Sequence, residues 1–293
     1  MEDLGLTNLF GQAYAGRRVL VTGHTGFKGS WLALWLRSLG ARVCGLALPA
    51  ATSPSHHALL GTRVEEDLID LRDAAAVAAA MRRFEPEVVF HLAAQPLVRR
   101  SYRASFLAAG EGGRVVALAT ARAGNVIGGG DWSEDRLIPD LVQAAAAGRA
   151  SEIRNPHATR PWQHVLEPLA GYLMLGQQLL ADPVACAQAW NFGPDAAGHA
   201  TVGEVVRAFG EHWPEVRQVI DDASHPHEAA QLHLDCTRAR EQLGWRSVWD
   251  LAKTLERTAR WYRSQHENGG VTSADDLALY VADARVARLA WAT

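Results

Sequence analysis

The stretch RRVLVTGHTGFKGSWLALWLRSLG, residues 17–40, decides the fold class of this chain. Its first part, residues 17–23, is a short apolar run that ends in glycine, which predicts a buried strand. Apolar side chains then recur at helical spacing, at Trp31, Leu34, Trp35 and Leu39, which predicts a helix over residues 29–40. A strand, a tight turn and a helix in this order begin a β-α-β unit.

Three glycines, Gly23, Gly26 and Gly29, lie between the predicted strand and the predicted helix. Without side chains there, the backbone can approach a pyrophosphate, and the helix N-terminus adds the positive end of its dipole. This placement predicts a dinucleotide site, and the alternative is a turn that is merely tight.

The remaining N-terminal half continues the alternation of strands and helices. Further strands are predicted at 41–48, about 64–70 and 87–94, and a helix at 74–84. The fold class is therefore α/β, with a Rossmann-type parallel sheet covered on both faces and a smaller mixed α/β C-terminal domain.

The ends of the second and third strands bear on the cofactor. The second ends in LALP, residues 46–49, without the acid that binds an adenosine ribose, so NAD and NADP both remain open. Asp70, at the end of the third, either accepts a hydrogen bond from an adenine amino group or caps the next helix.

Composition excludes several classes of protein. A chain of 293 residues with 48% apolar residues is neither fibrous nor disordered, and a net charge of −3 gives no reason to expect nucleic acid or a membrane surface as partner. Cys44, Cys186 and Cys236 lack CxxC spacing, so they indicate buried thiols, and no metal site is predicted. Without a signal-peptide pattern or an apolar run of roughly 20 residues, a cytoplasmic protein is expected.

Several strings together carry a resemblance. VTGHTGFKGSWLALWL (21–36), HLAAQPLVRRSY (91–102), RAGNVIGGGDW (122–132), RNPHATRPWQHVLE (154–167) and LDCTRAREQLGW (234–245) resemble the extended short-chain dehydrogenase/reductase superfamily. Within it they are similar to CDP-glucose 4,6-dehydratases, over residues of about 15 to about 265. A nucleotide-sugar 4-epimerase or another dehydratase is the alternative within the superfamily.

The resemblance implies a cofactor and its binding residues. Members use bound NAD as a hydride carrier: they oxidise the sugar at C4, eliminate water across C5 and C6, and return the hydride to C6. Matching positions imply that the cofactor-binding residues are Gly23, Thr25, Gly26, Phe27, Gly29, Asp70, Leu71, Ala93 and Ala94.

The resemblance also implies a nucleotide-sugar partner, CDP-glucose, and a homo-oligomer. By matching position, Asn125 would meet the diphosphate, Arg136 and Leu137 the base or ribose, and Arg154 and Arg160 the ribose and phosphates. The arginine fork suits phosphate oxygens, whereas the alternative for each single arginine is a surface salt bridge.

Three parts of the chain are expected. An NAD-binding domain would span 15–130, truncated between 96 and 114, a nucleotide-sugar domain 131–270, and a C-terminal tail 271–293. The boundary is placed after Ile127, where the alternation of strands and helices gives way to a loop rich in glycine and aspartate.

The family's catalytic base is missing. It would be a tyrosine with a lysine four residues later, but the only lysines, Lys28 and Lys253, follow His24 and Trp249 at that spacing. Only 19 residues separate Gln95 from Val115, where the family has roughly 60 more, including a central strand, the acid/base loop and much of the dimer interface.

The shared tripeptide SYR, residues 101–103, suggests a deletion at a short repeat, and reading the coding DNA there would separate a biological deletion from an assembly error. A single fused helix over about 96–110 would then connect the strands on either side of the gap. Without the central strand, the two strands that flanked it either pair with each other or leave their edges exposed.

No catalytic residue is assigned. His91 is predicted to orient the backbone beside NAD, and the alternatives are a substitute base or a buried, satisfied histidine. Three hypotheses follow for the chain: a working dehydratase, a non-catalytic protein that binds NAD and a CDP-sugar, or an unstable deletion product. The missing base favours impaired catalysis.

Overall fold

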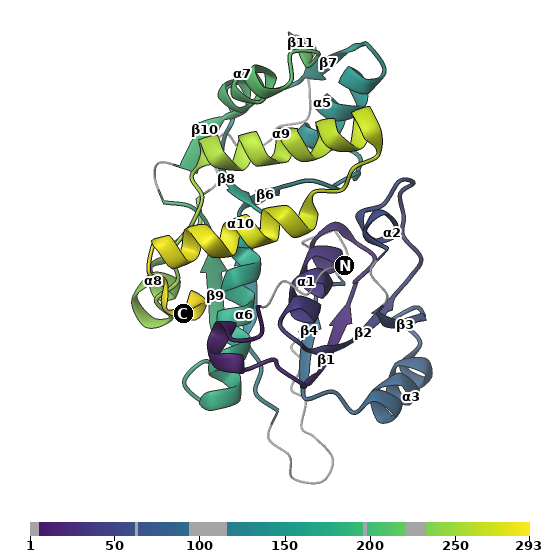
Figure 1. The fold of residues 1–293 in the computed structure, drawn as a ribbon, viewed down its shortest axis with the longest axis vertical. Coiled ribbons are helices and arrows are strands. Elements are labelled where there is room, and N and C mark those ends of the chain that lie inside the picture. The colour runs from purple at the N-terminus through teal and green to yellow at the C-terminus, as the bar shows by residue number, and fades with distance from the viewer. Residues whose placement is uncertain (1–5, 62–63, 94–115, 196–197, 221–232) are drawn as a thin grey trace.

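The computed structural model describes residues 6–61, 64–93, 116–195, 198–220 and 233–293 (Figure 1). In the N-terminal half the elements are η1 (Leu9–Gln12), β1 (Arg18–Thr22), α1 (Phe27–Ser38), β2 (Arg42–Ala47), α2 (His56–Leu60), β3 (Glu65–Leu68), α3 (Ala74–Phe84) and β4 (Val88–His91). The C-terminal half holds β5 (Thr120–Ala123), β6 (Asn125–Ile127), α5 (Leu137–Ala146), β7 (Ala150–Ile153), β8 (Thr159–His164), α6 (Leu166–Ala181), β9 (Ala189–Phe192), β10 (His199–Thr201), α7 (Val202–His212), β11 (Arg217–Ile220), α8 (Thr237–Gln242), α9 (Leu251–Asn268), α10 (Ser273–Val286) and η3 (Ala290–Ala292).

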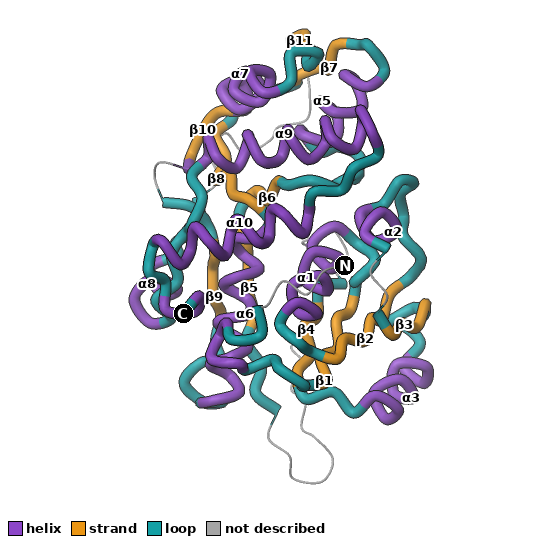
Figure 2. Tube along the Cα trace, viewed as in Figure 1, coloured by secondary structure: helices purple, strands orange, loops and turns teal. Residues whose placement is uncertain are grey.

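The first four strands form a parallel sheet in the order β3-β2-β1-β4. Leu20, Cys44 and Leu46 pack from one face of this sheet against Ala80 and Phe84 of α3. Helix α1 contacts β1 and β2, and Figure 2 shows it beside the strands. The predicted α/β class with a Rossmann-type parallel sheet is thus confirmed.

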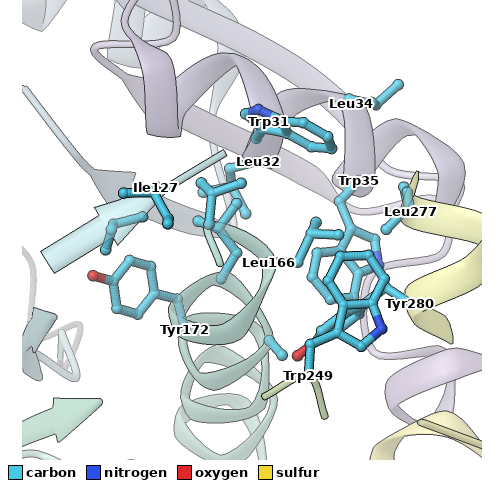
Figure 3. Packing of buried hydrophobic residues seen from close by; sticks show 14 of the residues in the cluster. Trp31, Leu32, Leu34, Trp35, Ile127, Leu166, Tyr172, Trp249, Leu277 and Tyr280 are labelled. Carbon is cyan, nitrogen blue, oxygen red and sulfur yellow. The ribbon is translucent and has the colours of Figure 1, made fainter. Parts of the chain in front are cut away.

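Helix α1 is buried on every side, not only along the predicted stripe. Residues Gly29 to Leu36 are all buried, including Leu32 and Leu36 between the predicted positions. The helix has the sheet on one side and α6 and α10 on others, and a helix with such surroundings is apolar all round. Figure 3 shows Leu32 beside Leu166 of α6 and Trp35 beside Tyr280 of α10.

The C-terminal half forms small sheets wrapped by helices. Strands β10, β8 and β6 form one sheet, and β11 with β7 and β5 with β9 form two parallel pairs. The tryptophans predicted to be core, Trp31, Trp35, Trp245 and Trp261, are at most 1% exposed. Cys44 and Cys236 are buried as predicted, whereas Cys186 is only partly buried. Among the described helices, none is both long and apolar enough to span a membrane.

In the described ranges, no ladder joins the four-stranded sheet to the β5-β9 pair. Within the described ranges, β4 pairs only with β1, and β5 pairs only with β9. Val89 of β4 is 45% exposed. Whether the neighbours of a lost central strand join or expose their edges stays a prediction. The predicted fused helix over 96–110 lies outside the described residues.

Candidate functional site

The glycine loop between β1 and α1 has the shape of a phosphate-binding turn. Gly23 has φ of +73°, and its amide donates to the Leu46 carbonyl across 2.8 Å. A Cβ on Gly29 would lie 2.1 Å from the Gly23 carbonyl oxygen, so only glycine lets the helix approach the turn this closely. Gly26 precedes the first turn of α1 without a side-chain cap. The loop therefore offers backbone N–H groups and a helix dipole to an anion.

The end of β4 lies against this loop. The Thr22 hydroxyl contacts His91 Nδ1 at 2.8 Å and accepts from the Ala93 amide at 3.3 Å, and Ala93 lies directly beside Gly23. His91 is hydrogen-bonded but exposed, so the alternative of a buried histidine is wrong. The geometry supports the prediction that His91 orients this backbone. Ala94 lies outside the described residues.

Of the remaining predicted cofactor residues, Thr25 and Phe27 lie at the loop and Leu71 lies beside α3. The Thr25 hydroxyl donates to the Leu48 carbonyl at 2.9 Å, which ties the loop to the end of β2, and Phe27 is the first residue of α1. Leu71 packs against the apolar cluster beneath α3.

Asp70 is a partner of Arg72. It accepts from Arg72 Nε at 2.9 Å and from the Arg72 amide at 2.9 Å, which holds the pKa of its carboxyl at about 2. The alternative that Asp70 caps α3 is wrong, because Asp73 accepts from the amides of the first turn. The two acids are three residues apart, and local sequence cannot decide between them.

The loop of residues 128–131 joins the glycine turn to the C-terminal half. Trp31 Nε1 of α1 donates to the Gly129 carbonyl at 2.9 Å, and the Tyr262 hydroxyl donates to the Asp131 carbonyl at 2.5 Å. Both donors are buried. The loop is therefore fixed between α1 and α9.

A positive group that the sequence analysis did not single out lies in the first turn of α1. The pKa of Lys28 is lowered to about 8, first by burial, then by the nearby charge of Arg136, while Asp131 acts in the opposite direction. Two cations close enough to interact are suited to a polyanionic ligand. The signal in the sequence was the position of Lys28 inside the glycine motif.

The predicted substrate residues fall into two neighbourhoods. Arg136 precedes α5, and Arg154 lies near it through an exposed ion pair with Asp135 at 3.6 Å. Asn125 begins β6 opposite Trp162, and Arg160 lies on β8 two residues before that tryptophan. Leu137 begins α5 and is partly buried. The described structure thus groups these residues within each neighbourhood, and their roles remain predictions.

The described tyrosines are unsuited to be a base. Tyr14, Tyr172, Tyr262 and Tyr280 are buried, and burial raises the pKa of each. A phenolate base needs a lowered pKa. The fifth tyrosine, Tyr102, lies outside the described residues, and Phe106 occupies the position four residues later.

Comparison with known proteins agrees with this geometry. A family model described as GDP-mannose 4,6 dehydratase matches residues 20–123. An epimerase from Methanothermobacter thermautotrophicus superposes with a TM-score of 0.68 at 21% identity, over 90% of this chain and 96% of that one. The dTDP-glucose 4,6-dehydratase of Bacillus anthracis superposes with a TM-score of 0.63 at 15% identity, over 85% and 97%. The fold is that of the nucleotide-sugar epimerases and dehydratases.

One curated relative is much more similar in sequence. The CDP-glucose 4,6-dehydratase of Salmonella typhimurium is 36% identical over 329 aligned positions, which cover 86% of this chain and 92% of the relative. The chain belongs to the CDP-glucose 4,6-dehydratase family. Since 86% of 293 residues is about 252, about 77 of the 329 aligned positions have no residue of this chain. The relative therefore has sequence that this chain lacks.

Proposed function

We propose that this chain binds NAD and a nucleotide sugar, CDP-glucose, but dehydrates the sugar far more slowly than a complete family member because it lacks the family's base. The observation that carries this proposal is the absence of any tyrosine with a lysine four residues later, in a family that the sequence defines by its other motifs.

The residues present fit NAD. The turn at Gly23, the close approach of Gly29 and the uncapped start of α1 leave room and donors for a pyrophosphate, and Thr25 and Ala93 line the same loop. The Bacillus anthracis dehydratase with this fold is described as a complex with NAD. When bound, NAD would supply a hydride acceptor and donor for the sugar.

The nucleotide sugar would be held by the C-terminal half. Arg136 and Lys28 present neighbouring positive charges to a diphosphate, and Arg154, Arg160, Leu137 and Asn125 are the further positions implied by the family. The missing base alone accounts for a loss of about 10²- to 10⁴-fold in rate, because general-base catalysis contributes about that much.

Calorimetry and turnover on one preparation test this proposal. NAD and CDP-glucose are titrated into the purified chain, and product is followed by the absorbance of the 4-keto sugar, with a full-length family member as the positive control. We expect binding of both ligands and little turnover. Turnover at the rate of the control would refute the missing-base proposal, and failure to bind NAD would refute the cofactor assignment.

Two alternatives are tested in the same assay. A 4-epimerase relative, UDP-glucose 4-epimerase 3 of Oryza sativa subsp. japonica, is 29% identical but covers only 42% of this chain, which favours the dehydratase. UDP-glucose added in place of CDP-glucose would reveal epimerisation. An unstable deletion product would instead show no cooperative thermal transition.

A further inference from the structure

Two histidines and a glutamate meet at the glycine loop. His24 belongs to the loop between β1 and α1, His57 to α2 and Glu66 to β3. His24 Nε2 lies 2.7 Å and His57 Nε2 3.3 Å from Glu66 Oε2, and the three potential ligand atoms all lie within 4.8 Å of one another. The residues are 33 and 9 positions apart in the chain. From the sequence, only the cysteines were considered for a metal site, and none was predicted.

Neighbouring elements hold this arrangement in place. Glu66 pairs with Gly45 of β2, and a Cβ at position 45 would lie 2.3 Å from the His24 ring, so the absent side chain makes room for the imidazole. Helix α2 is fixed by His56, whose ring contacts the hydroxyls of Ser30 at 2.7 Å and Ser273 at 2.8 Å. His57, the next residue, is thereby directed to the cluster.

We propose that His24, His57 and Glu66 bind a divalent transition-metal ion of the Zn²⁺ class. Zinc bonds of about 2.0–2.2 Å to histidine and glutamate in a tetrahedron place neighbouring ligand atoms about 3.3 Å apart. The His57–Glu66 distance already has this value, and the His24–Glu66 distance needs to widen by about 0.6 Å.

The exposure of the three side chains suits three protein ligands and one water. His24 is fully buried, whereas the His57 and Glu66 side chains are 21% and 36% exposed, so solvent reaches the cluster from their side. One carboxylate and two imidazoles favour zinc over magnesium or calcium, which prefer oxygen ligands.

One feature sets the strength of binding. His24 Nδ1 is buried and has no partner within the described part of the chain. Metal-binding histidines ordinarily donate the other ring N–H to an acceptor, and loss of that partner costs about 10- to 100-fold in affinity. We therefore expect a zinc affinity lower by that factor than that of a site in which every histidine ligand has a hydrogen-bond acceptor for its second ring nitrogen.

The metal would couple to the cofactor loop. His24 lies between Gly23 and Gly26. A metal ion that bridges His24 to His57 of α2 and Glu66 of β3 would therefore restrain the loop that the proposed function assigns to NAD. A restrained loop loses less entropy when a ligand binds, which gives positive coupling between metal and NAD. This coupling rests on the proposed function, whereas metal binding itself does not.

Cobalt spectroscopy tests the site without NAD or turnover. Co²⁺ is titrated into untagged, chelator-treated protein while its visible d–d absorption is recorded, and Zn²⁺ is then added as competitor. The variants are His57→Gln and Glu66→Gln, both partly exposed, rather than a change at buried His24. The matched control is Glu65→Gln, one residue away, which pairs with Arg83 and Arg42 instead of the histidines.

We expect a one-to-one Co²⁺ complex that Zn²⁺ displaces, in the wild type and Glu65→Gln, and at least about a tenfold loss of affinity in each cluster variant. Thermal melts check that all four proteins fold. Binding that is the same in wild type and both cluster variants, or no cobalt spectrum at all, would overturn the proposal. Metal binding without any change in NAD affinity would overturn only the coupling.

Discussion

The indole nitrogen of Trp31 donates a hydrogen bond of 2.9 Å to the carbonyl oxygen of Gly129, 98 residues away in the chain. This bond connects the helix that begins at the glycine turn with the loop that leads into the predicted nucleotide-sugar part. Both groups are buried, so neither has water as an alternative partner. We expect the bond to help position the two predicted half-sites relative to each other.

Trp31→Phe removes that donor and leaves a buried carbonyl unsatisfied. We expect a loss of about 1–3 kcal/mol in the free energy of unfolding, measured by urea titration, together with weaker CDP-glucose binding. Trp190→Phe is the control, because its Nε1 donates locally to Cys186. An unchanged sugar affinity in Trp31→Phe would show that the bond does not position the substrate side.

Gly29→Ala tests the cofactor loop. Its Cβ would lie 2.1 Å from the Gly23 carbonyl oxygen, so the turn must shift, and we expect at least about a tenfold loss of NAD affinity by calorimetry. Gly210→Ala in α7 is the matched control, since its Cβ would lie 3.8 Å from the Val216 carbonyl oxygen. Equal NAD affinity in the two variants would place the dinucleotide elsewhere.

Lys28→Met tests the charge beside Arg136. We expect binding of CDP, measured by calorimetry, to weaken by about 10- to 100-fold when this charged donor is lost. Because the pKa of Lys28 is about 8, wild-type affinity should also fall as the pH rises through 8 and the amine loses its charge. Lys253→Met is the control, as Lys253 lies on α9 and pairs with Glu256. A wild-type affinity that is flat between pH 7 and 9 would exclude Lys28 from the site.

The buried carboxyl of Glu167 should make the free energy of unfolding depend on pH. It is buried and accepts from the amides of Val248 and Trp249 and from the Tyr280 hydroxyl, yet burial raises its pKa from 4.5 to about 7. A carboxyl with a raised pKa binds its proton more tightly in the folded state than in the unfolded state. The protonated Glu167 therefore adds its full amount to the free energy of unfolding below about pH 4.5, and this amount is lost as the pH rises through about 7.

Urea titrations of wild type and Glu167→Gln between pH 5 and 8 measure that contribution. We expect the wild type to lose on the order of 3 kcal/mol relative to the variant as the pH rises. Asp276, whose pKa burial raises to about 6, is present in both proteins and cancels. Parallel pH profiles would show that Glu167 stays ionised when buried.

Several parts of the fold followed from local pattern. The strand, turn and helix of residues 17–40, the later strands and the helix over 74–84 appear within a few residues of their predicted bounds, because periodicity and glycine placement act locally. The cap of α3 did not follow, because Asp70 and Asp73 both precede that helix and only the turn geometry selects Asp73. The predicted domain boundaries remain predictions.

The sequence by itself determined the family, the glycine turn and the lack of a tyrosine–lysine pair, since each depends on residue identity at fixed spacing. Tertiary structure decided that α1 is buried all round, that four tyrosines have raised pKa values, and that β4 and β5 pair with different strands in the described chain. It also brought His24, His57 and Glu66 together. Strand order and register set these contacts between distant residues, and no local periodicity encodes them.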